Sequence, residues 1–552
     1  MQYKKLYVQL LFSFSMACSF STAQETFLPL NRDFSNKYDA NLNTLSCDFH
    51  TDIKPYRIGD LKNHINSDSV DNSYFFDAGK KRSWLERKIR KENFLLVNTE
   101  DFSLTADPLV NFEMNNDISN NKHALLNTRG VQVFGSIGKE VSFYTSFFEN
   151  QATFVNYIDT FIQKNSVIPG QGVPKAFKGK AGKYDFAYAT GYVSFTPSKH
   201  FNFQFGNDKN FIGDGYRSLI LSDNSFSYPF LKITTSVWKI KYMNLYTTML
   251  DIHDPPLAFN NDDFHRKYVS MHYLSYNVYK RLTVGFFEGI VLRGRDSTSF
   301  RGYDWNYLNP VIFLRPVEFS LGSSDNALMG INSKFKVCNT FLLYMQVVLD
   351  EFKLSEVKAG NGWHGNKQAV QFGWKYHDVF TVKNLNWQTE LNYVRPFMYS
   401  HYKLATSNII QNYTHYGQAL AHPLGANFME VLSFLNYRYK CFFVEGKLSF
   451  AYYGEDIYDS ISGNYRSFGK DIFRSYYDRG NGDYGYRVGS GDKTVLAYQD
   501  FRVACILNPK TNLCLEAGVT LRTLANSASN ISHNNMIHVS LRSSLNNFYY
   551  DF

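Results

Sequence analysis

The chain has 552 residues, of which 44% are hydrophobic, and a formal net charge of +9 at pH 7. Its 58 basic residues against 49 acidic ones leave too small a surplus to indicate a nucleic-acid-binding protein. After Ala23 no segment approaches the ~20 uninterrupted apolar residues of a membrane helix. A mean hydropathy of -0.33 usually indicates a soluble protein, but a membrane β-barrel is similarly polar because only alternate residues face lipid.

The first residues of the chain have the pattern of an export signal. Lysines precede a mostly apolar stretch over residues 6–20, and residues 21–23 (Ser-Thr-Ala) supply small side chains for cleavage. We therefore predict a signal peptide over residues 1–23. Cys18 suggests a lipid anchor, but Ser15 stands three residues before it, where a lipoprotein signal usually has Leu.

Residues 24–128 differ from the rest of the chain and are predicted to form a periplasmic or lumen-plugging region. Within them, residues 83–95 (SWLERKIRKENFL) are predicted to form a short helix. Basic residues precede the helix and run along it: Lys80, Lys81, Arg82, Arg87, Lys88, Arg90 and Lys91. A solvated helix face explains such a run of charge, and contact with an anionic glycan or a lipid phosphate is the functional alternative.

Strict alternation of apolar and polar residues recurs along the chain and predicts β-strands with one apolar and one polar face. The clearest examples are residues 385–393, 442–452 and 511–522. Each is about ten residues long, which is the length of a tilted strand that crosses a bilayer. On the second strand, Glu445 and Lys447 share the polar face, which we expect to face a wet lumen.

Weaker alternation fills much of the remaining chain. Further candidate strands lie at 109–117, 131–137, 140–148, 185–196, 200–206, 230–236, 238–250, 267–278, 280–292, 326–337, 340–353, 366–379, 427–440 and 494–507. All candidates together give about 16 to 18 strands, and a single-chain barrel is expected to have an even number. The sequence therefore predicts an all-β fold, a large antiparallel transmembrane β-barrel over residues 129–552, with a small, partly helical N-terminal region.

The connections between the predicted strands alternate between short and long, as an outer-membrane barrel requires. Short turns are predicted at 138–139 and 508–510, and long loops at 150–183, 293–325, 396–426 and 454–493. One predicted strand does not alternate cleanly. Glu288 falls in line with the apolar residues Val284, Phe286 and Ile290, so the pattern assigns no lipid-facing side to it.

The last residues of the chain also alternate. Phe548, Tyr550 and Phe552 fall on one face, which continues the apolar face of residues 537–541. A final aromatic strand behind an export signal is typical of bacterial outer-membrane barrels. We therefore predict that residues 547–552 form the closing strand and that the protein lies in the cell outer membrane.

No residue pattern predicts catalysis or metal binding. The chain lacks the HExxH, P-loop, GxSxG and CxxC motifs, and its 14 histidines show no metal-ligand spacing. His272 and Ser275 lie three residues apart on one predicted strand and therefore face opposite sides. Cys505 and Cys514 also fall on opposite faces, which disfavours a disulfide. We predict a protein that is not an enzyme, has no cofactor and uses cysteine as a small buried residue.

The most unusual segment is residues 205–230, FGNDKNFIGDGYRSLILSDNSFSYPF. Its glycines allow tight turns, and its charged residues bring both signs into a short space. A loop folded into the barrel lumen and held by its own salt bridges would explain this composition. A binding site is the alternative, with Tyr216 for stacking on a sugar ring and Arg217 for a uronic acid or phosphate. The candidate glycan contacts are Asp208, Lys209, Asp214, Tyr216 and Arg217.

This segment resembles the signature of the Wzi-like capsule-assembly family of outer-membrane barrels, and most closely its Bacteroidetes branch, the gliding-motility protein RemB. Residues 306–330 (NYLNPVIFLRPVEFSLGSSDNALMG) and 422–437 (HPLGANFMEVLSFLNY) are similar to the same family. The resemblance runs from about Arg129 to the end of the chain. The matched positions are Gly206, Asp208, Gly213, Asp214, Gly215, Arg217, Ser218, Leu221, Ser222, Asn309, Pro310, Glu318, Asp325, Asn326, Gly330, Gly425, Asn427 and Glu430.

The resemblance implies a barrel of about eighteen strands, partly closed by helical and loop elements. It also implies a non-enzymatic role, which is to hold exported polysaccharide at the cell surface or to support surface gliding. The expected partners are surface polysaccharide, outer-membrane lipid and other gliding or envelope proteins, and no nucleic acid. The alternative function is that of a diffusion channel, a porin.

Overall fold

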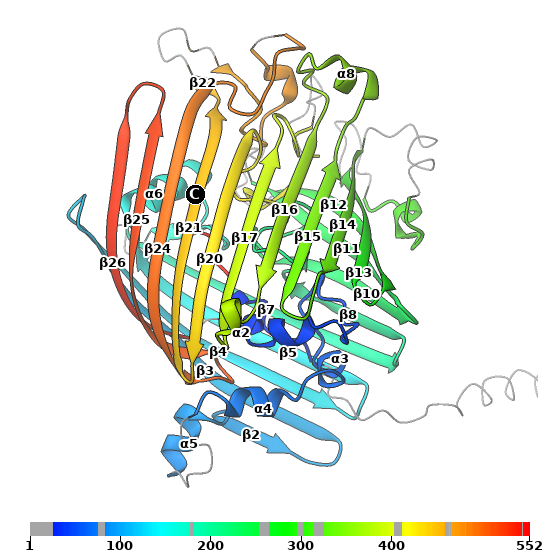
Figure 1. Cartoon of the computed structure of the whole chain (residues 1–552), viewed down its shortest axis with the longest axis vertical. Helices are drawn as coiled ribbons and strands as arrows, with labels where there is room; N and C mark the ends of the chain where they lie inside the picture. The colour runs from blue at the N-terminus through cyan, green and yellow to red at the C-terminus, as the bar shows by residue number, and fades with distance from the viewer. Residues whose placement is uncertain are drawn as a thin grey trace, which may run out of the picture.

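A computed structural model of the chain describes residues 26–552, apart from 76–82, 177–181, 253–263, 295–301, 314–324, 402–410, 459–462, 464, 481 and 544. The predicted signal peptide over residues 1–23 thus lies outside the described residues. The described part forms a closed antiparallel β-barrel of 18 strands, which confirms the predicted fold class (Figure 1). Helices and loops pack inside the barrel.

The barrel strands follow one another in chain order, and the last strand closes the wall by pairing with the first. They are β3 (Phe102–Asp117), β4 (Lys122–Ile137), β5 (Val141–Thr153), β7 (Tyr184–Ser198), β8 (Phe201–Asp208), β10 (Tyr228–Val237), β11 (Ile240–Asp251), β12 (His265–Tyr279), β13 (Leu282–Arg293), β14 (Asn326–Lys336), β15 (Phe341–Leu349), β16 (Gln368–Tyr376), β17 (Leu385–Val394), β20 (Phe428–Tyr439), β21 (Phe442–Glu455), β24 (Asp492–Asn508), β25 (Leu513–Asn526) and β26 (Ile531–Ser543). The short strands β2 (Leu95–Asn98) and β6 (Lys175–Ala176) pair with β3 and β7. Three further pairs are separate from the barrel sheet: β1 (Ile53–Lys54) with β9 (Phe211–Ile212), β18 (Thr414–His415) with β19 (Gln418–Ala419), and β22 (Ile457–Tyr458) with β23 (Tyr465–Arg466).

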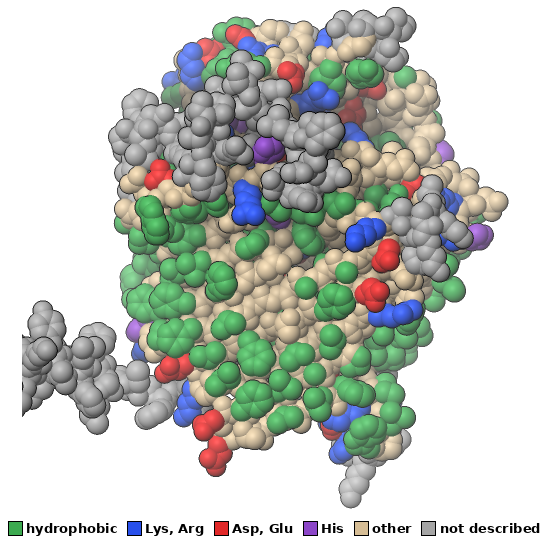
Figure 2. Space-filling model, turned by 180° about the vertical axis from the view of Figure 1, so that it is seen from behind, with side chains coloured by type: hydrophobic (Ala, Val, Ile, Leu, Met, Phe, Trp, Pro, Cys, Tyr) green, Lys and Arg blue, Asp and Glu red, His purple; other side chains and the backbone are tan. Residues whose placement is uncertain are grey.

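Alternating side chains give the wall a polar inner face and an apolar outer face. On β17, Glu390 and Asn392 are fully buried toward the lumen, whereas Trp387 and Leu391 are each 38% exposed on the outside. Apolar side chains cover much of the wall in the space-filling view (Figure 2). A wall of this kind is suited to stand between lipid and a polar lumen.

The two ends of the barrel carry different connections. At the short-turn end, strands are joined by turns such as 199–200, 238–239 and 440–441. At the long-loop end, the longest connections are residues 154–183, 294–325, 395–427 and 456–491, which lie where the sequence predicts long loops. The short-turn end is at the bottom of Figure 1 and the long-loop end at the top.

The barrel begins earlier in the chain than the sequence predicts. β3 starts at Phe102 and β4 at Lys122, so the predicted boundary between residues 128 and 129 falls inside a barrel strand. The candidate strand at 109–117 covers only the second part of β3, because Pro108 and a cluster of Asn and Asp residues interrupt the pattern around it. These residue types are uncommon inside strands, and the sequence pattern therefore places the start of the barrel too late in the chain.

The last residues of the chain do not form the closing strand, so that prediction is wrong. The final strand, β26, ends at Ser543, and residues 545–552, called here the C-terminal segment, have no regular secondary structure. This segment turns into the lumen, where Tyr549 and Asp551 are 3% and 1% exposed. Its aromatic residues alternate because they contact the lumen filling on one side, not because they face lipid. Phe552, for example, packs against Phe161 with ring centroids 4.7 Å apart.

A covering loop explains the strand on which Glu288 interrupts the pattern. Glu288 alternates with the inward-facing Phe287 of β13, and its carboxylate accepts a hydrogen bond from the backbone N–H of Phe313 at 2.7 Å. The same loop places the carbonyl oxygen of Leu308 3.0 Å from the hydroxyl of Tyr246 on β11. A polar outward residue is thus tolerated because a loop shields this part of the wall.

Residues 26–75, called here the plug, pack against the lumen face of the wall at the short-turn end. They contain α2 (Arg32–Leu42), α3 (Ile58–Lys62), α4 (Ser67–Asn72) and β1. Asn31 caps α2 by accepting a hydrogen bond from the N–H of Phe34 at 2.9 Å. Ion pairs join the plug to separate strands of the wall: Arg32 to Glu445 at 2.7 Å, Asp39 to Lys375 at 2.6 Å and Asp60 to Lys241 at 2.9 Å.

The remaining helices are short. They are α5 (Trp84–Arg90), α6 (Asn156–Asn165), α8 (Leu354–Ala359), η2 (Trp305–Leu308), η3 (Val379–Thr381) and η4 (Tyr476–Asp478). The helix predicted over residues 83–95 is therefore present but shorter, because β2 begins at Leu95. Among the described residues, no helix has the length and apolar character needed to cross a bilayer.

The cysteines of the described chain are free thiols. Cys514 is buried, as predicted for a small core residue, and Cys505 is half-buried on the other face of the wall. The pair that the sequence does not suggest is Cys441, in the turn before β21, and Cys505 of β24, whose Sγ atoms lie 3.2 Å apart.

The outward face of β26 provides a test of the apolar wall. We expect Ile537→Lys, in the middle of the strand, to lower the free energy of unfolding in phospholipid vesicles by about 2–4 kcal/mol, because it places a charge in hydrocarbon. Ile531→Lys, on the same face at the strand end, should cost only about 0–1 kcal/mol. Urea titrations of both variants measure the difference, and equal losses would contradict a lipid-facing wall.

Candidate functional site

The buried guanidinium of Arg217 is the centre of the lumen filling. Its side chain is 1% exposed, and Nη2 donates to Glu430 of β20 and to Asp551 of the C-terminal segment, both at 2.9 Å. The backbone N–H groups of Tyr216 and Arg217 donate to the carboxylate of Glu390 on β17 at 2.9 and 3.2 Å. One residue thus joins the loop between β8 and β10, two wall strands and the C-terminal segment.

Glycines allow the loop to approach the wall this closely. A Cβ added at Gly215 would lie 2.4 Å from Oε2 of Glu390 and 3.0 Å from Oε1 of Gln371. Any side chain at this position would therefore displace the carboxylate that receives the backbone N–H groups. Gly213 has a φ of 141°, a backbone conformation that residues with a side chain rarely adopt.

Further charged groups surround the Arg217 ion pairs. Nε2 of His422 lies 2.7 Å from Oε2 of Glu430, and Lys447 forms a second ion pair with Asp551. Burial favours the neutral form of Asp551, but the charges of Arg217 and Lys447 outweigh it and hold its pKa below the ordinary value. A carboxylate that stays charged therefore fixes the C-terminal segment in the lumen.

Three of the five candidate glycan contacts hold the loop between β8 and β10 together or attach it to neighbouring elements. Asp208 accepts a hydrogen bond from the N–H of Lys209 at 2.8 Å. The ammonium of Lys209 donates to two backbone carbonyl groups at 2.8 and 3.0 Å. Asp214 is 4% exposed and accepts a hydrogen bond from the hydroxyl of Thr51 in the plug.

The other two candidates, Tyr216 and Arg217, differ in access. Arg217 already has two carboxylate partners, so a uronic acid or phosphate would have to displace one of them. Tyr216 is half-buried and lines the main cavity of the lumen. Its ring lies 4.8 Å from that of Phe434 and 5.3 Å from that of Tyr549, measured between centroids. Of the five, Tyr216 is therefore the residue best placed to touch a ligand.

Parts of the three sequence stretches that resemble one family meet in the lumen. Arg217 of the first stretch pairs with Glu430 of the third, and Ile220 of the first lies against Gly330 of the second. The side chain of Asn427 holds two long loops together through the carbonyl oxygens of residues 454, 468 and 490. The matched position Glu318 lies outside the described residues. The matched residues described here act mainly in holding the lumen filling together.

A cavity of about 240 Å³ remains in the lumen between α2, α6 and the inner faces of β3, β20, β21 and β24 to β26. Its charged lining consists of Arg32, Asp33, Glu113, Glu445, Lys447, Asp500, Arg502, Glu516, His538, Arg542 and Asp551. Its rings are Phe154, Tyr157, Tyr216, Phe434, Tyr498, Phe548 and Tyr550. Smaller cavities of about 40 and 80 Å³ flank α2. The described residues therefore fill much of the lumen and leave this polar and aromatic space between them.

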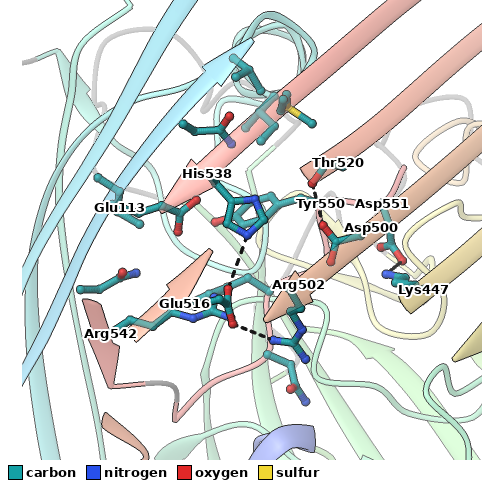
Figure 3. Close-up of a pocket in the computed structure, with 18 of the residues that line it drawn as sticks. Glu113, Lys447, Asp500, Arg502, Glu516, Thr520, His538, Arg542, Tyr550 and Asp551 are labelled. Atoms are coloured by element: carbon teal, nitrogen blue, oxygen red, sulfur yellow. Dashed lines mark hydrogen bonds and ion pairs between the residues drawn. The ribbon is translucent and has the colours of Figure 1, made fainter. Parts of the chain in front are cut away.

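Arg502 organises the ion pairs on one side of this cavity. Its guanidinium lies 2.8 Å from Asp33, 2.6 Å from Glu445 and 3.2 Å from Glu516. Arg542 makes a further ion pair with Glu516 at 2.8 Å. Figure 3 shows Arg502, Glu516 and Arg542 close together, on β24, β25 and β26. The basic groups on this side are therefore already matched by carboxylates.

Two carboxylates of the cavity have no such match. Within the described part of the chain, neither Glu113 nor Asp500 has a basic group within 4.0 Å, although Asp500 accepts a hydrogen bond from Thr520 at 2.6 Å. Figure 3 shows the two carboxylates on opposite sides of the space, near Tyr550 and His538. Carboxylates accept hydrogen bonds from hydroxyl groups, and aromatic rings cover apolar faces. The cavity can therefore hold a molecule rich in hydroxyl groups.

No sequence motif identified the residues of the cavity, although the polar faces of the predicted strands indicate some of them. Glu445 and Lys447 fall on the polar face of a predicted strand, as do Glu516 and Arg542 on later strands. Charged residues at lumen-facing positions of neighbouring strands mark the wall of the site. The contribution of Arg32 and Asp33 could not be found in this way, because it depends on the plug entering the lumen.

A serine and a histidine lie in hydrogen-bond contact in the lumen, as they do in the catalytic triads of hydrolases. The hydroxyl of Ser275 lies 2.7 Å from Nδ1 of His50 and 2.7 Å from Oδ2 of Asp52. In a hydrolase triad the acid contacts the histidine, whereas here it contacts the serine itself. Ser275 is also fully buried. Among the described residues, no group of three or more His, Cys, Asp or Glu is placed to hold a metal ion.

Comparisons with known proteins identify a structural relative. No protein-family model matches the chain, and no curated protein matches it in sequence. Wzi of Escherichia coli, an outer-membrane protein involved in group 1 capsule assembly and a carbohydrate-binding β-barrel, is similar with a TM-score of 0.51 and 11% identity, over 94% of this chain and 99% of Wzi. OprD of Pseudomonas aeruginosa gives a TM-score of 0.41 at 8% identity, over 82% and 96% of the two chains. At these identities the likeness to Wzi establishes the fold alone.

The ion pairs of Asp551 give a prediction about the C-terminal segment. Asp551→Asn removes the negative charge between Arg217 and Lys447, so we expect docking of residues 545–552 to weaken by about 3–5 kcal/mol. Amide hydrogen exchange of this segment should rise strongly, while Asp551→Glu, which keeps the charge, should restore much of the protection.

The lowered pKa of Asp551 adds a pH dependence to the same measurement. A depressed acid pKa contributes stability above the unfolded-state pKa of about 4, and this stability is lost as the pH falls through the folded-state pKa. Protection of the segment should therefore be constant near pH 7 and decline only below about pH 4. A segment that is released between pH 7 and pH 5 would contradict the assignment.

Proposed function

We propose that this protein is an outer-membrane barrel that binds a surface polysaccharide without modifying it, and so attaches the polymer to the cell or helps to assemble it. The observation that carries the proposal is the lumen cavity lined by aromatic rings and by the unmatched carboxylates Glu113 and Asp500. Sugar hydroxyl groups would donate hydrogen bonds to these carboxylates, and Tyr216 would cover the apolar face of a sugar ring.

The apolar outer wall supports the outer-membrane location, because such a surface would aggregate in water and is suited to lipid. In barrels of this class the short turns face the periplasm and the long loops face the cell exterior. We therefore place the plug on the periplasmic side and the longest loops outside. The carbohydrate binding described for Wzi, which has the same fold, agrees with this proposal.

A non-enzymatic role is part of the proposal. The serine that meets the histidine in the lumen also contacts the plug residue Asp52, and among the carboxylates that line the cavity in the described chain all but Glu113 already serve an ion pair or a hydrogen bond. Binding by many weak polar contacts suits a long polymer, because repeated units add up to firm attachment without any covalent step.

Capsule retention and surface gliding both remain within this proposal, since one surface glycan could serve both. The resemblance of residues 205–230 to the gliding-motility branch is the observation that favours the second role. Capsule staining and single-cell tracking of the same deletion strain separate the two. Loss of cell-bound polymer with normal gliding assigns the first role, and the reverse result assigns the second.

The cavity proposal predicts a specific change in polymer retention. A deletion strain should make normal amounts of polysaccharide but release it into the medium. Complementation with the double variant Glu113→Gln and Asp500→Asn should restore less than about a tenth of the cell-bound polymer, because each lost charged hydrogen bond contributes about 1.5–3 kcal/mol. Glu140→Gln, in an exposed turn outside the cavity, is the matched control and should restore it fully.

The plugged lumen predicts the outcome of conductance measurements, which test the alternative of a diffusion channel. The intact protein should pass little current in planar bilayers, because the plug, the loop of residues 209–227 and the C-terminal segment occupy the lumen. A variant that lacks residues 26–75 should conduct measurably. A large and stable current through the intact protein would favour the channel instead.

A further inference from the structure

We propose that α5 and the adjoining β2 form a membrane-binding surface that lies among the phospholipid head groups at the short-turn end of the barrel. This surface, called here the interfacial segment, comprises residues 84–97. The inference goes beyond polysaccharide binding, but it rests on the proposed outer-membrane location. It assigns a role to the basic run that the cavity leaves unexplained.

The interfacial segment exposes large apolar side chains that nothing in the described chain covers. Trp84 is 60% exposed, Leu85 57%, Phe94 55% and Leu96 60%, and no residue of α5 is buried. Figure 2 shows apolar and basic side chains gathered at the lower edge of the molecule, where this segment lies. A contiguous apolar patch beside charged groups indicates a surface that binds a partner or a membrane.

The helix has the division of faces that an interfacial helix requires. At about 100° per residue, Trp84, Leu85 and Ile89 fall within an arc of about 140°. Arg87 and Arg90 fall on the opposite side, whereas Lys88 falls within the arc, where its ammonium donates to the carbonyl oxygen of Asn93 at 3.0 Å. A helix of this kind lies flat in a membrane interface, with its apolar face a few ångströms into the acyl region and its charges among the head groups.

Polar contacts with the wall hold the segment in place without covering its apolar face. The side chain of Asn508, at the end of β24, donates to the carbonyl oxygens of Lys88 and Glu92 at 3.4 and 3.2 Å. The backbone N–H of Phe94 donates to the buried carboxylate of Asp107 at 2.8 Å. The helix is thus tied down by its backbone and its C-terminal end, which leaves the apolar side chains free to enter lipid.

The charge of the segment matches an anionic lipid surface. Arg87, Lys88, Arg90 and Lys91 stand against only two acidic residues between positions 84 and 92. Each basic residue near an anionic leaflet contributes about 1 kcal/mol of attraction. Trp84 adds a side chain that prefers the boundary between head groups and acyl chains.

Continuity with the barrel wall favours lipid over a protein partner. β2 pairs with β3, so the interfacial segment extends the wall directly. α5 also packs against β24, whose outward residue Val503 is 52% exposed on the apolar belt. A bilayer that surrounds the belt therefore reaches the segment without any change in the structure. The leaflet concerned is the phospholipid leaflet on the short-turn side.

Fluorescence quenching on the full-length protein tests this inference. Leu85→Cys and Arg87→Cys, on opposite faces of α5, are labelled with one fluorophore in a background without the native cysteines. Val539→Cys, on the outward face of β26, serves as the lipid-exposed reference. The protein is reconstituted in vesicles of phosphatidylethanolamine and phosphatidylglycerol that carry nitroxide-labelled acyl chains.

We expect quenching at position 85 to exceed that at position 87 by about twofold or more, since only the apolar face enters the acyl region. Adding Arg90→Glu and Lys91→Glu should reduce the quenching at position 85. Equal quenching at 85 and 87, with strong quenching at 539, would overturn the inference and leave the outer-membrane location intact. A label at 85 that is shielded from both lipid nitroxide and aqueous iodide would indicate a protein partner and also overturn it. Weak quenching at 539 would instead contradict the location itself.

Discussion

A guanidinium can be buried inside a protein only when carboxylates and hydrogen-bond acceptors replace the water that it loses, and the filled lumen depends on this constraint at Arg217. Glu430 comes from the wall and Asp551 from the C-terminal segment, so the two must be in place together. Removing either partner would leave a buried charge unpaired, which is far more costly than losing a surface ion pair. The wall, the loop of residues 209–227 and the C-terminal segment are therefore one cooperative unit, with the cavity as the space left between them.

The strands of the wall were predictable from the sequence because the alternation of polar and apolar residues lies within each strand. Each residue of a strand faces either lipid or the lumen, so positions such as Trp387 and Glu390 reveal their side by alternation alone. The pattern failed where another element changed the surroundings. Glu288 faces outward under a loop, and Phe548, Tyr550 and Phe552 alternate against the lumen filling. In both places the partner is distant in sequence, and no local pattern contains it.

The candidate site was only partly predictable for the same reason. The segment of residues 205–230 was identified as a lumen loop or a binding site, but its charged side chains are held mainly by the wall, the plug and the C-terminal segment and not by salt bridges of its own. Arg217 and Asp214 have partners in β20 and the plug, which spacing along the chain cannot indicate. The cavity is instead lined largely by strands near the C-terminal end of the chain, β20, β21 and β24 to β26. Its acidic residues stood on polar strand faces, but only the closed barrel shows that Glu113 of the first strand faces Asp500.

The C-terminal segment follows directly on β26, the strand that closes the wall against β3. Residue 551 can reach Arg217 only from a β26 that is already seated beside its neighbours, because the intervening chain is too short to span the lumen from elsewhere. Docking of this segment thus requires that β26 has already paired with β3. A barrel in which β26 is not yet paired with β3 would therefore have a C-terminal segment outside its place in the lumen, with Arg217 and Lys447 lacking their shared carboxylate.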